Sequence, residues 1–99
     1  MIYVEQAKIL SQTPFAAEQF IVRLHAPQCA RHAEPGTFVH LRCDDLLPMR
    51  RPFSIMRTDP EAGWIDILYR VFGEGTRLLS RRRAGEHLSL LGPIGKPFV

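Results

Sequence analysis

The sequence has few cysteines and no long apolar segment, and these scarcities exclude several classes of protein. Its 99 residues include two cysteines, Cys29 and Cys43. An iron–sulfur cluster held by thiolates needs about four cysteine ligands, so this chain cannot build one alone. No run approaches the roughly 18 consecutive apolar residues of a membrane-spanning helix, and the first residues lack the order of a secretory signal. We therefore expect a cytoplasmic protein without a membrane segment, with reduced thiols of which one or both are buried.

Patterns typical of metal sites and hydrolytic sites are also missing. The four histidines show no HxxxH-type spacing, and no Ser/His/Asp order or carboxylate pair stands out. The sequence therefore predicts no metal ligands and no catalytic side chains. The formal net charge is +3, which could suggest nucleic acid as a partner. Because few aromatics are interleaved with the arginines, we expect no nucleic-acid partner.

The alternation of apolar and polar residues predicts one small all-β domain over residues 1–99. A period of two and β-branched or aromatic enrichment indicate short strands, bounded by turn signals, at 2–10, 19–25, 37–43, 52–57, 64–72 and 87–91. Residues 27–36 and 92–97 are expected to form loops. One helix is expected at 76–83, capped by Gly75 or Thr76 and stopped at Gly85. This spacing favours a small antiparallel barrel over βαβ units.

Residues 51–54 (RPFS) combine chemistry suited to a ligand with plausible structural roles. The planar guanidinium of Arg51 can grip a phosphate through two hydrogen bonds, although an exposed strand-edge arginine is the ordinary alternative. Pro52 fixes φ and removes a donor, which confines the segment to a sheet edge that a ligand can approach. Phe53 can stack on a ring or belong to the core. Ser54 can hydrogen-bond a ring system or bond locally.

A second group of residues follows the strand expected at 64–72. Gly73 and Gly75 allow the backbone to approach a phosphate closely, and Thr76 offers a hydroxyl and an amide at a helix start. A plain helix cap is the alternative for this segment. Arg70 interrupts an apolar strand and needs a partner. That partner is either a phosphate or a nearby carboxylate: Asp66, Glu74 or Glu86.

Taken together, these residues resemble the FAD-binding domain of the ferredoxin reductase superfamily. Residues 51–54 are similar to its Arg-x-x-Ser flavin motif, and residues 73–79 (GEGTRLL) to its pyrophosphate loop and helix. Residues 35–39 (PGTFV) resemble its Pro-Gly-x-Phe entry to a barrel strand, and residues 92–98 (GPIGKPF) the segment that leaves the barrel. Within the superfamily, the likeness is greatest to the electron transfer subunits of dihydroorotate dehydrogenase.

The resemblance implies a six-stranded antiparallel Greek-key barrel with one short helix that binds FAD. It implies that Arg51 contacts the pyrophosphate and that Pro52, Phe53 and Ser54 line the isoalloxazine ring. The other cofactor-binding residues that it implies flank the flavin or hold phosphate: Leu68, Tyr69, Arg70, Gly75 and Thr76. The redox chemistry would belong to the cofactor, and the protein would position it.

The same resemblance implies parts beyond this chain. The superfamily's NAD-binding domain and the four-cysteine [2Fe-2S] region are expected outside residues 1–99, so the resemblance implies that the chain is an N-terminal fragment that does not turn over alone. The implied whole protein passes electrons between a dihydroorotate dehydrogenase flavin, an iron–sulfur cluster, FAD and NAD in pyrimidine biosynthesis. Its expected partner is the catalytic subunit, and a homodimer of the fragment through an uncovered apolar face stays open.

Two alternative functions remain at this point. One is the FAD domain of another NAD(P)H-dependent reductase, such as a hydrogenase or oxygenase reductase component. The other is a non-catalytic basic β-barrel that binds nucleic acid or an acidic partner, for which binding should depend strongly on salt and not on flavin.

Overall fold

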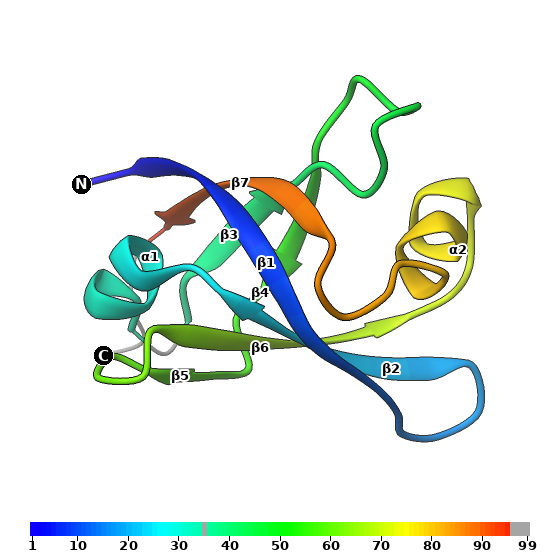
Figure 1. Cartoon of the computed structure of the whole chain (residues 1–99), viewed down its shortest axis with the longest axis horizontal. Coiled ribbons are helices and arrows are strands. Elements are labelled where there is room, and N and C mark those ends of the chain that lie inside the picture. Colours follow the sequence, from blue (N-terminus) through cyan, green and yellow to red (C-terminus); the bar gives the residue numbers. More distant parts are fainter. Residues whose placement is uncertain (35, 96–99) are drawn as a thin grey trace.

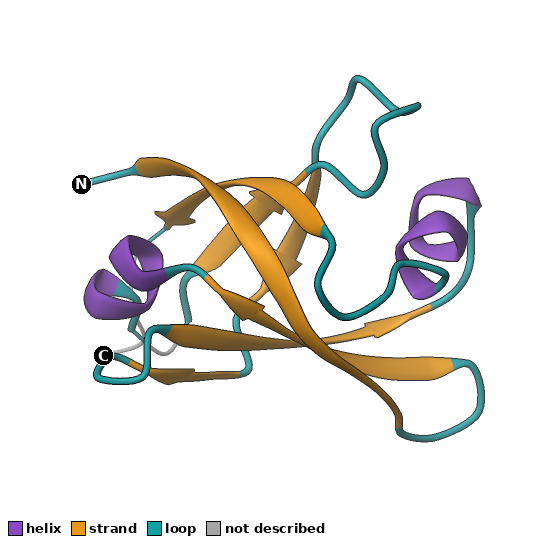
Figure 2. Cartoon of the chain, viewed as in Figure 1, coloured by secondary structure: helices purple, strands orange, loops and turns teal. Residues whose placement is uncertain are grey.

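A computed structural model describes residues 1–34 and 36–95 of the chain (Figures 1 and 2). Seven strands form one curled antiparallel sheet with the order β4-β3-β7-β1-β2-β6-β5. The strands are β1 (Tyr3–Pro14), β2 (Gln19–His25), β3 (Phe38–Leu41), β4 (Arg51–Ser54), β5 (Arg57–Asp59), β6 (Trp64–Arg70) and β7 (His87–Ile94). The sheet rolls into an open barrel, which confirms the predicted all-β antiparallel fold; the count of seven strands rather than six is a minor difference.

The additional strand arises where the segment predicted as one strand at 52–57 divides in two. The Ile55 N–H donates to the Thr37 carbonyl, and the next N–H, that of Met56, donates to the Asp66 carbonyl. The chain thus crosses here from the β3 side of the barrel to the β6 side. As a result β4 and β5 end up at opposite ends of the strand order, and the barrel is closed at this corner.

The core forms because alternate strand residues point into the barrel, as the period of two requires. On β6, Ile65, Ile67 and Tyr69 are buried, whereas Leu68 and Arg70 are exposed. The same alternation on the other strands buries a set of aliphatic side chains: Ala7, Ile9, Val22, Leu24, Val39, Leu41, Leu88 and Leu90. This inward set gives a continuous apolar interior and leaves the rims of the barrel for polar groups.

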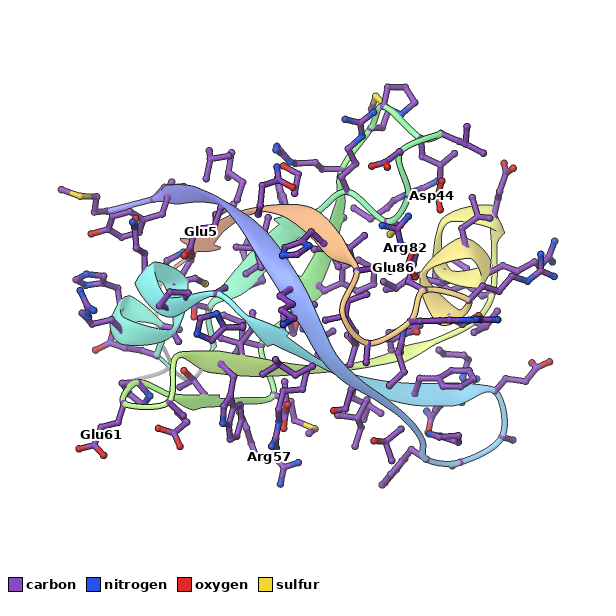
Figure 3. All side chains as sticks on the ribbon, viewed as in Figure 1. Glu5, Asp44, Arg57, Glu61, Arg82 and Glu86 are labelled. Carbon is purple, nitrogen blue, oxygen red and sulfur yellow. The ribbon has the colours of Figure 1, made fainter. Side chains whose placement is uncertain are left out.

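Residues 27–32 form a helix, α1 (Pro27–His32), where the sequence predicted a loop. Pro27 stands in its first turn, where a missing N–H costs nothing. The carboxylate of Glu5, on β1, accepts hydrogen bonds from the N–H groups of Gln28 and Cys29 at 3.1 and 2.9 Å (Figure 3). Because this cap comes from a distant strand, no local sequence pattern predicts the helix. The hydrogen bond from the Cys29 N–H to Glu5 also fixes Cys29 in its buried position.

The predicted helix is α2 (Glu74–Ser80), which begins at Glu74 rather than Thr76 and ends before Arg81. Its N-cap is Gly73, not Gly75 or Thr76. In the described residues neither helix has the length and apolar character needed to span a membrane. The start of α2 stands at one rim of the barrel, where it can contribute to a site.

Two strands are longer than predicted. The first continues through residues 11–14 to Pro14, and its register with β2 shifts between Ile9 and Ser11. The last continues past Leu91 to Ile94, so residues 92–94 are strand rather than loop. In both cases pairing with neighbouring strands overrides local turn signals. The expectations for Pro35 and for residues 96–98 lie outside the described residues.

Candidate functional site

The main cleft lies between two strand edges that have no neighbour. β4 pairs with β3 on one side only, and β5 pairs with β6 only at Trp64–Asp66, which leaves one edge of residues 67–70 free. The space between these edges and the start of α2 has a volume of about 440 Å³, within the usual range for ligand sites. Its lining residues are Arg51, Pro52, Phe53, Ser54, Leu68, Tyr69, Arg70, Phe72, Gly73, Gly75 and Thr76.

This set contains every residue that the sequence predicted for the cofactor. Two segments, 51–54 and 68–76, come together because the chain crosses at residues 55–56 from β4 into β5, which pairs with β6. The Met56–Asp66 hydrogen bond joins them at one end of the cleft. At the other end Arg51 lies against Gly75. The cleft therefore has a Ser54–Leu68 end and an Arg51–Gly75 end.

Arg51 provides a cation at the second of these ends. Its Nε atom lies 3.5 Å from the point that a Cβ at Gly75 would occupy, and its Cγ atom 3.7 Å. The Arg51 side chain thus lies along the start of α2, at ordinary van der Waals distance from the Cβ position of Gly75. Within residues 1–34 and 36–95, Arg51 forms no ion pair with a carboxylate, so its charge is available to an anion.

Arg70 is likewise without an acidic partner in the described part of the chain. Asp66, one of the partners considered from the sequence, is occupied by Arg23 at 2.8 Å and Arg57 at 3.1 Å. Glu86, another, faces Arg82, with the closest N and O atoms 3.7 Å apart (Figure 3). Arg70 is exposed, and it adds a second uncompensated positive charge to the cleft.

Aromatic rings make up the inner part of the cleft. The Phe53 ring meets the Tyr69 ring edge-on at a centroid distance of 6.1 Å, and Tyr69 stacks on Phe20 at 5.9 Å. The Tyr69 hydroxyl donates to Gln12 Oε1 at 2.9 Å, and Gln12 Nε2 donates to the Leu79 carbonyl on α2 at 2.6 Å. Burial raises the pKa of Tyr69 to about 12, so the phenol stays protonated and keeps donating.

The Ser54–Leu68 end carries no charged side chain among the residues that line the cleft. Ser54 and Pro52 are exposed on β4, and Leu68 is 39% exposed on β6. Within the described residues the Ser54 hydroxyl has no protein partner, so it can bond to a ligand. Because Pro52 has no N–H, the edge of β4 presents fewer donors than an ordinary strand.

Thr76 has a different role from the one the sequence suggested for its hydroxyl. Its Oγ1 accepts from the N–H groups of Phe72 and Gly73 at 3.0 and 3.2 Å and donates to the Gly73 carbonyl at 3.2 Å. These three bonds use the donor and both acceptor sites of a hydroxyl. Thr76 therefore shapes the turn. Its backbone N–H and that of Gly75 lie in the first turn of α2, where N–H groups have no partner within the helix, so they can bind an anion.

The structure adds Phe72 and Gly73 to the predicted set. Both lie in the turn between β6 and α2. Gly73 was noted in the sequence as part of the glycine segment but was not assigned to the site. Phe72 was placed inside the strand predicted at 64–72. Its position directly before the glycines could have indicated a site residue, because an apolar side chain in that turn does not pack into the core.

Both cysteines are free and fully buried, as predicted. Burial raises the pKa of Cys29 to about 12 and that of Cys43 to about 11, although Arg51 acts in the opposite direction on Cys43. Cys43 Sγ lies 3.9 Å from the Cβ position of Gly75, so it packs behind the cleft as a neutral thiol. No grouping of three or more potential metal ligands occurs in the described residues.

Comparisons with known proteins found solved structures with the same fold and a set of sequence relatives. No family model matches the chain. Among solved structures, an NADH-dependent reduced ferredoxin-NADP oxidoreductase matches with a TM-score of 0.89 and 28% identity, covering 96% of this chain and 34% of that one. The ferredoxin reductase in carbazole 1,9a-dioxygenase matches with a TM-score of 0.79 and 22% identity, over 95% of this chain and 29% of that one.

Two of the sequence relatives are named dihydroorotate dehydrogenase B (NAD(+)), electron transfer subunit. The protein of Desulforamulus reducens is 39% identical, over 100% of this chain and 38% of its own length. That of Lysinibacillus sphaericus is 36% identical, over 99% of this chain and again 38% of its own length. The chain thus spans well under half the length of these relatives.

The fold and the cleft define the chain as a ferredoxin reductase-like barrel domain. Within that class, it is homologous to a part of the electron transfer subunits of dihydroorotate dehydrogenase B.

Proposed function

We propose that this chain is the FAD-binding domain of a flavoprotein electron transfer subunit. The observation that carries the proposal is the convergence of segments 51–54 and 68–76 on one cleft, in a chain homologous to proteins named as electron transfer subunits. The whole protein would pass electrons between the flavin of a dihydroorotate dehydrogenase catalytic subunit, a [2Fe-2S] cluster, FAD and NAD in pyrimidine biosynthesis.

The residues present suit a flavin dinucleotide. Arg51 and Arg70 carry charges without acidic partners in the described residues, and a diphosphate would neutralise them. Gly75 leaves room for close approach of the backbone, where an Ala Cβ would stand over the Arg51 side chain. Phe53 and Leu68 provide apolar contact, and Ser54 offers a hydroxyl. The free strand edges add backbone groups that can hydrogen-bond a heterocycle.

The part of this chain in the reaction is to bind and orient. FAD, when bound, supplies one- and two-electron transfer, and we assign no catalytic side chain. Tyr69 fixes the spacing between β6 and α2 through Gln12. Arg51 holds a diphosphate and places the ring system toward Ser54. NAD, the cluster and the catalytic subunit would bind parts of the protein that correspond to the remaining length of the relatives, so the chain alone would not turn over.

A second candidate is the FAD domain of a different NAD(P)H-dependent reductase. The TM-score of 0.89 to the NADH-dependent ferredoxin-NADP oxidoreductase favours it, because the same barrel serves there. A four-cysteine pattern following the barrel in the whole protein would support the dihydroorotate dehydrogenase assignment. Absence of that pattern there would favour the plain reductase.

The proposal is tested by titrating FAD into apo-protein, with flavin fluorescence and absorbance as readouts. Arg51→Ala should weaken FAD binding about 10- to 100-fold, because hydrogen bonds to charged groups contribute about 1.5–3 kcal/mol. Arg51→Lys should recover part of the loss, since it restores the charge but not the planar fork. Arg83→Ala is the matched control, because Arg83 is another exposed arginine and lies in the turn between α2 and β7.

Two results would contradict the proposal. One is a wild-type protein that takes up no FAD. The other is an Arg51→Ala variant that binds FAD as tightly as Arg83→Ala does. If the wild type instead binds polyanions with a steep salt dependence and ignores flavin, the basic binding-module alternative replaces it.

A further inference from the structure

A small polar pocket lies on the outer face of the barrel, and it shares no lining residue with the main cleft. It is formed where β1, β2, β6 and β5 lie side by side in the sheet, and its volume is about 230 Å³. This volume is below the usual range for sites that hold drug-sized ligands, so the pocket suits a small one. Its lining residues are Ser11, Thr13, Ile21, Arg23, Arg57 and Asp66.

The strand register places one polar side chain from each of the four strands in a single row. Ser11 on β1 lies opposite Arg23 on β2, which in turn lies opposite Asp66 on β6. Arg57 on β5, whose side chain points away from the barrel in Figure 3, completes the row on the other side of Asp66. Because these strands are distant in the sequence, the four groups meet only in the folded sheet.

The shift in the register of β1 directs two hydroxyl groups into this pocket. Before the shift Ile9 is buried in the core, and after it Gln12 points inward, where its side chain accepts a hydrogen bond from the Tyr69 hydroxyl. Ser11 and Thr13 stand on either side of Gln12 and therefore point outward. Without the shift both hydroxyl groups would point into the barrel. Irregularities of this kind often redirect side chains beside ligand sites.

The two arginines of the pocket are held in place but keep unused donors. Arg23 donates from Nε and Nη2 to the Asp66 carboxylate at 2.8 and 3.0 Å, and its guanidinium lies 3.6 Å from the Trp64 ring centroid. Arg57 Nη2 lies 3.1 Å from the same carboxylate. A guanidinium has five N–H groups, so each arginine retains donors that no group in the described residues uses. Groups that are already oriented lose little freedom on binding a ligand.

The charges on this face leave one positive charge without a partner. Asp66 compensates one of the two arginines that line the pocket. In the adjacent row Lys8 lies opposite His25 and Asp59 lies opposite Trp64, so that row adds one charge of each sign when the histidine is neutral. A net positive charge with several N–H and O–H donors around a small space is suited to an oxyanion.

We propose that this outer pocket binds a small tetrahedral oxyanion, either inorganic phosphate or the phosphate group of a small metabolite. The unused N–H groups of Arg23 and Arg57 hold the anion, and the hydroxyl groups of Ser11 and Thr13 donate to it. In the described part of the chain neither hydroxyl has a protein partner. Asp66 does not touch the anion and acts by orienting the guanidinium groups. The pocket is separate from the cleft, so the proposal does not rest on the FAD function.

The experiment titrates inorganic phosphate into the full-length protein that carries this chain, at constant ionic strength. Phosphorus-31 NMR measures the dissociation constant, and thermal unfolding gives a second readout, because a ligand of the native state raises Tm as its concentration rises. The variants are Arg57→Gln, Ser11→Ala and Thr13→Val. Lys8→Gln is the matched control, because Lys8 lies in the next row of the sheet and does not line the pocket. Glycerol phosphate, titrated in parallel, distinguishes the two sources: tighter binding than inorganic phosphate indicates a metabolite, and equal or weaker binding indicates the free ion.

The expected result is specific to the pocket. Arg57→Gln should weaken phosphate binding about ten-fold, the lower end of the range for a hydrogen bond to a charged group, because this side chain is partly exposed. Ser11→Ala and Thr13→Val should each weaken it about two- to ten-fold, as expected for a neutral hydrogen bond. Lys8→Gln should change it less than about two-fold, as for an exposed charge. Saturating FAD and the Arg51→Ala substitution should leave phosphate affinity unchanged, because both act at the cleft.

Three results would overturn the proposal. Equal losses in Lys8→Gln and Arg57→Gln would show only a general attraction of this face for anions. Phosphate that is displaced by FAD, or lost in Arg51→Ala, would occupy the cleft instead. A wild-type protein without saturable phosphate binding would have no such site. If Arg57→Gln does not fold, Ser11→Ala decides, since it leaves both ion pairs of Asp66 in place. A protein that binds phosphate in this pocket but takes up no FAD would retain the site and fail the proposed function, so the two failures are distinguishable.

Discussion

Replacing Asp66 by Asn should loosen the corner at which the barrel closes. Asp66 is fully buried, and its carboxylate accepts two hydrogen bonds from Arg23, at 2.8 and 3.0 Å, and lies 3.1 Å from Arg57 Nη2. These residues stand opposite one another on β2, β6 and β5. One carboxylate thus joins three strands and compensates two cations (Figure 3 shows Arg57 on the lower side).

The expected loss of stability in Asp66→Asn depends on how exposed the two arginine side chains are. Removing one partner of a fully buried ion pair costs about 3–5 kcal/mol. Here the side chains of Arg23 and Arg57 remain 36% and 59% exposed, so water can solvate the cations left behind. We therefore expect Asp66→Asn to lower the free energy of unfolding by about 2–3 kcal/mol. For a domain of this size that is a fall in Tm of about 10–20 °C.

Removal of Arg23 and removal of Arg57 should lower the free energy of unfolding by different amounts, which gives a second test. Arg57→Ala should cost no more than about 1 kcal/mol, as exposed pairs do. Arg23→Ala should cost more, because its fork engages both carboxylate oxygens and its guanidinium lies 3.6 Å from the Trp64 ring centroid. Urea unfolding of ligand-free protein, followed by far-UV circular dichroism, measures all three variants. Asp66→Asn within about 0.5 kcal/mol of wild type, the range of neutral surface changes, would refute the reasoning, as would a larger loss for Arg57→Ala than for Arg23→Ala.

Other outcomes follow from the described contacts. Gly92→Ala should destabilise the fold by about 1–3 kcal/mol, because its Cβ would lie 2.9 Å from Val39 Cγ1; unchanged urea unfolding would contradict this. Cys29 and Cys43, with pKa values raised to about 12 and about 11, should resist a thiol reagent at about pH 8 until urea unfolds the protein, and rapid labelling of the native state would show that they are not buried. A backbone N–H, followed by the Arg82 guanidinium, lowers the pKa of Asp44, so its stabilising effect is present at neutral pH and lost as the pH falls below about 4. Asp44→Asn should therefore be less stable than wild type at neutral pH and equal to it in acid, and a pH-independent difference would argue against the assignment.

Much of the architecture could be predicted because its cause is local. The strands at 19–25 and 64–70 follow from a period of two and β-branched residues, and the structure has them nearly as expected. The helix at Pro27–His32 could not be predicted, because the carboxylate of Glu5 that caps it comes from another strand. The division at 55–56 depends on hydrogen bonds to Thr37 and Asp66, which only the folded barrel supplies.

The site shows the same division between local and distant causes. The residues predicted to line a cofactor cleft do line one, since Pro52 confines residues 51–54 to a sheet edge and the glycines directly follow β6. That they bind FAD stays a prediction. The internal use of the Thr76 hydroxyl could not be predicted from the residue type, because it depends on how the turn between β6 and α2 closes.

The two unpaired strand edges also bear on what happens when the cleft is empty. Free N–H and C=O groups on an edge can pair with another polypeptide, which is a route to aggregation. Pro52 removes one donor from β4 and so blunts that edge. A ligand in the cleft would take the place of the strand that the barrel lacks there. The opening between β4 and β6 would then serve two purposes. It would bind the cofactor, and once filled it would prevent the isolated barrel from associating with its own copies.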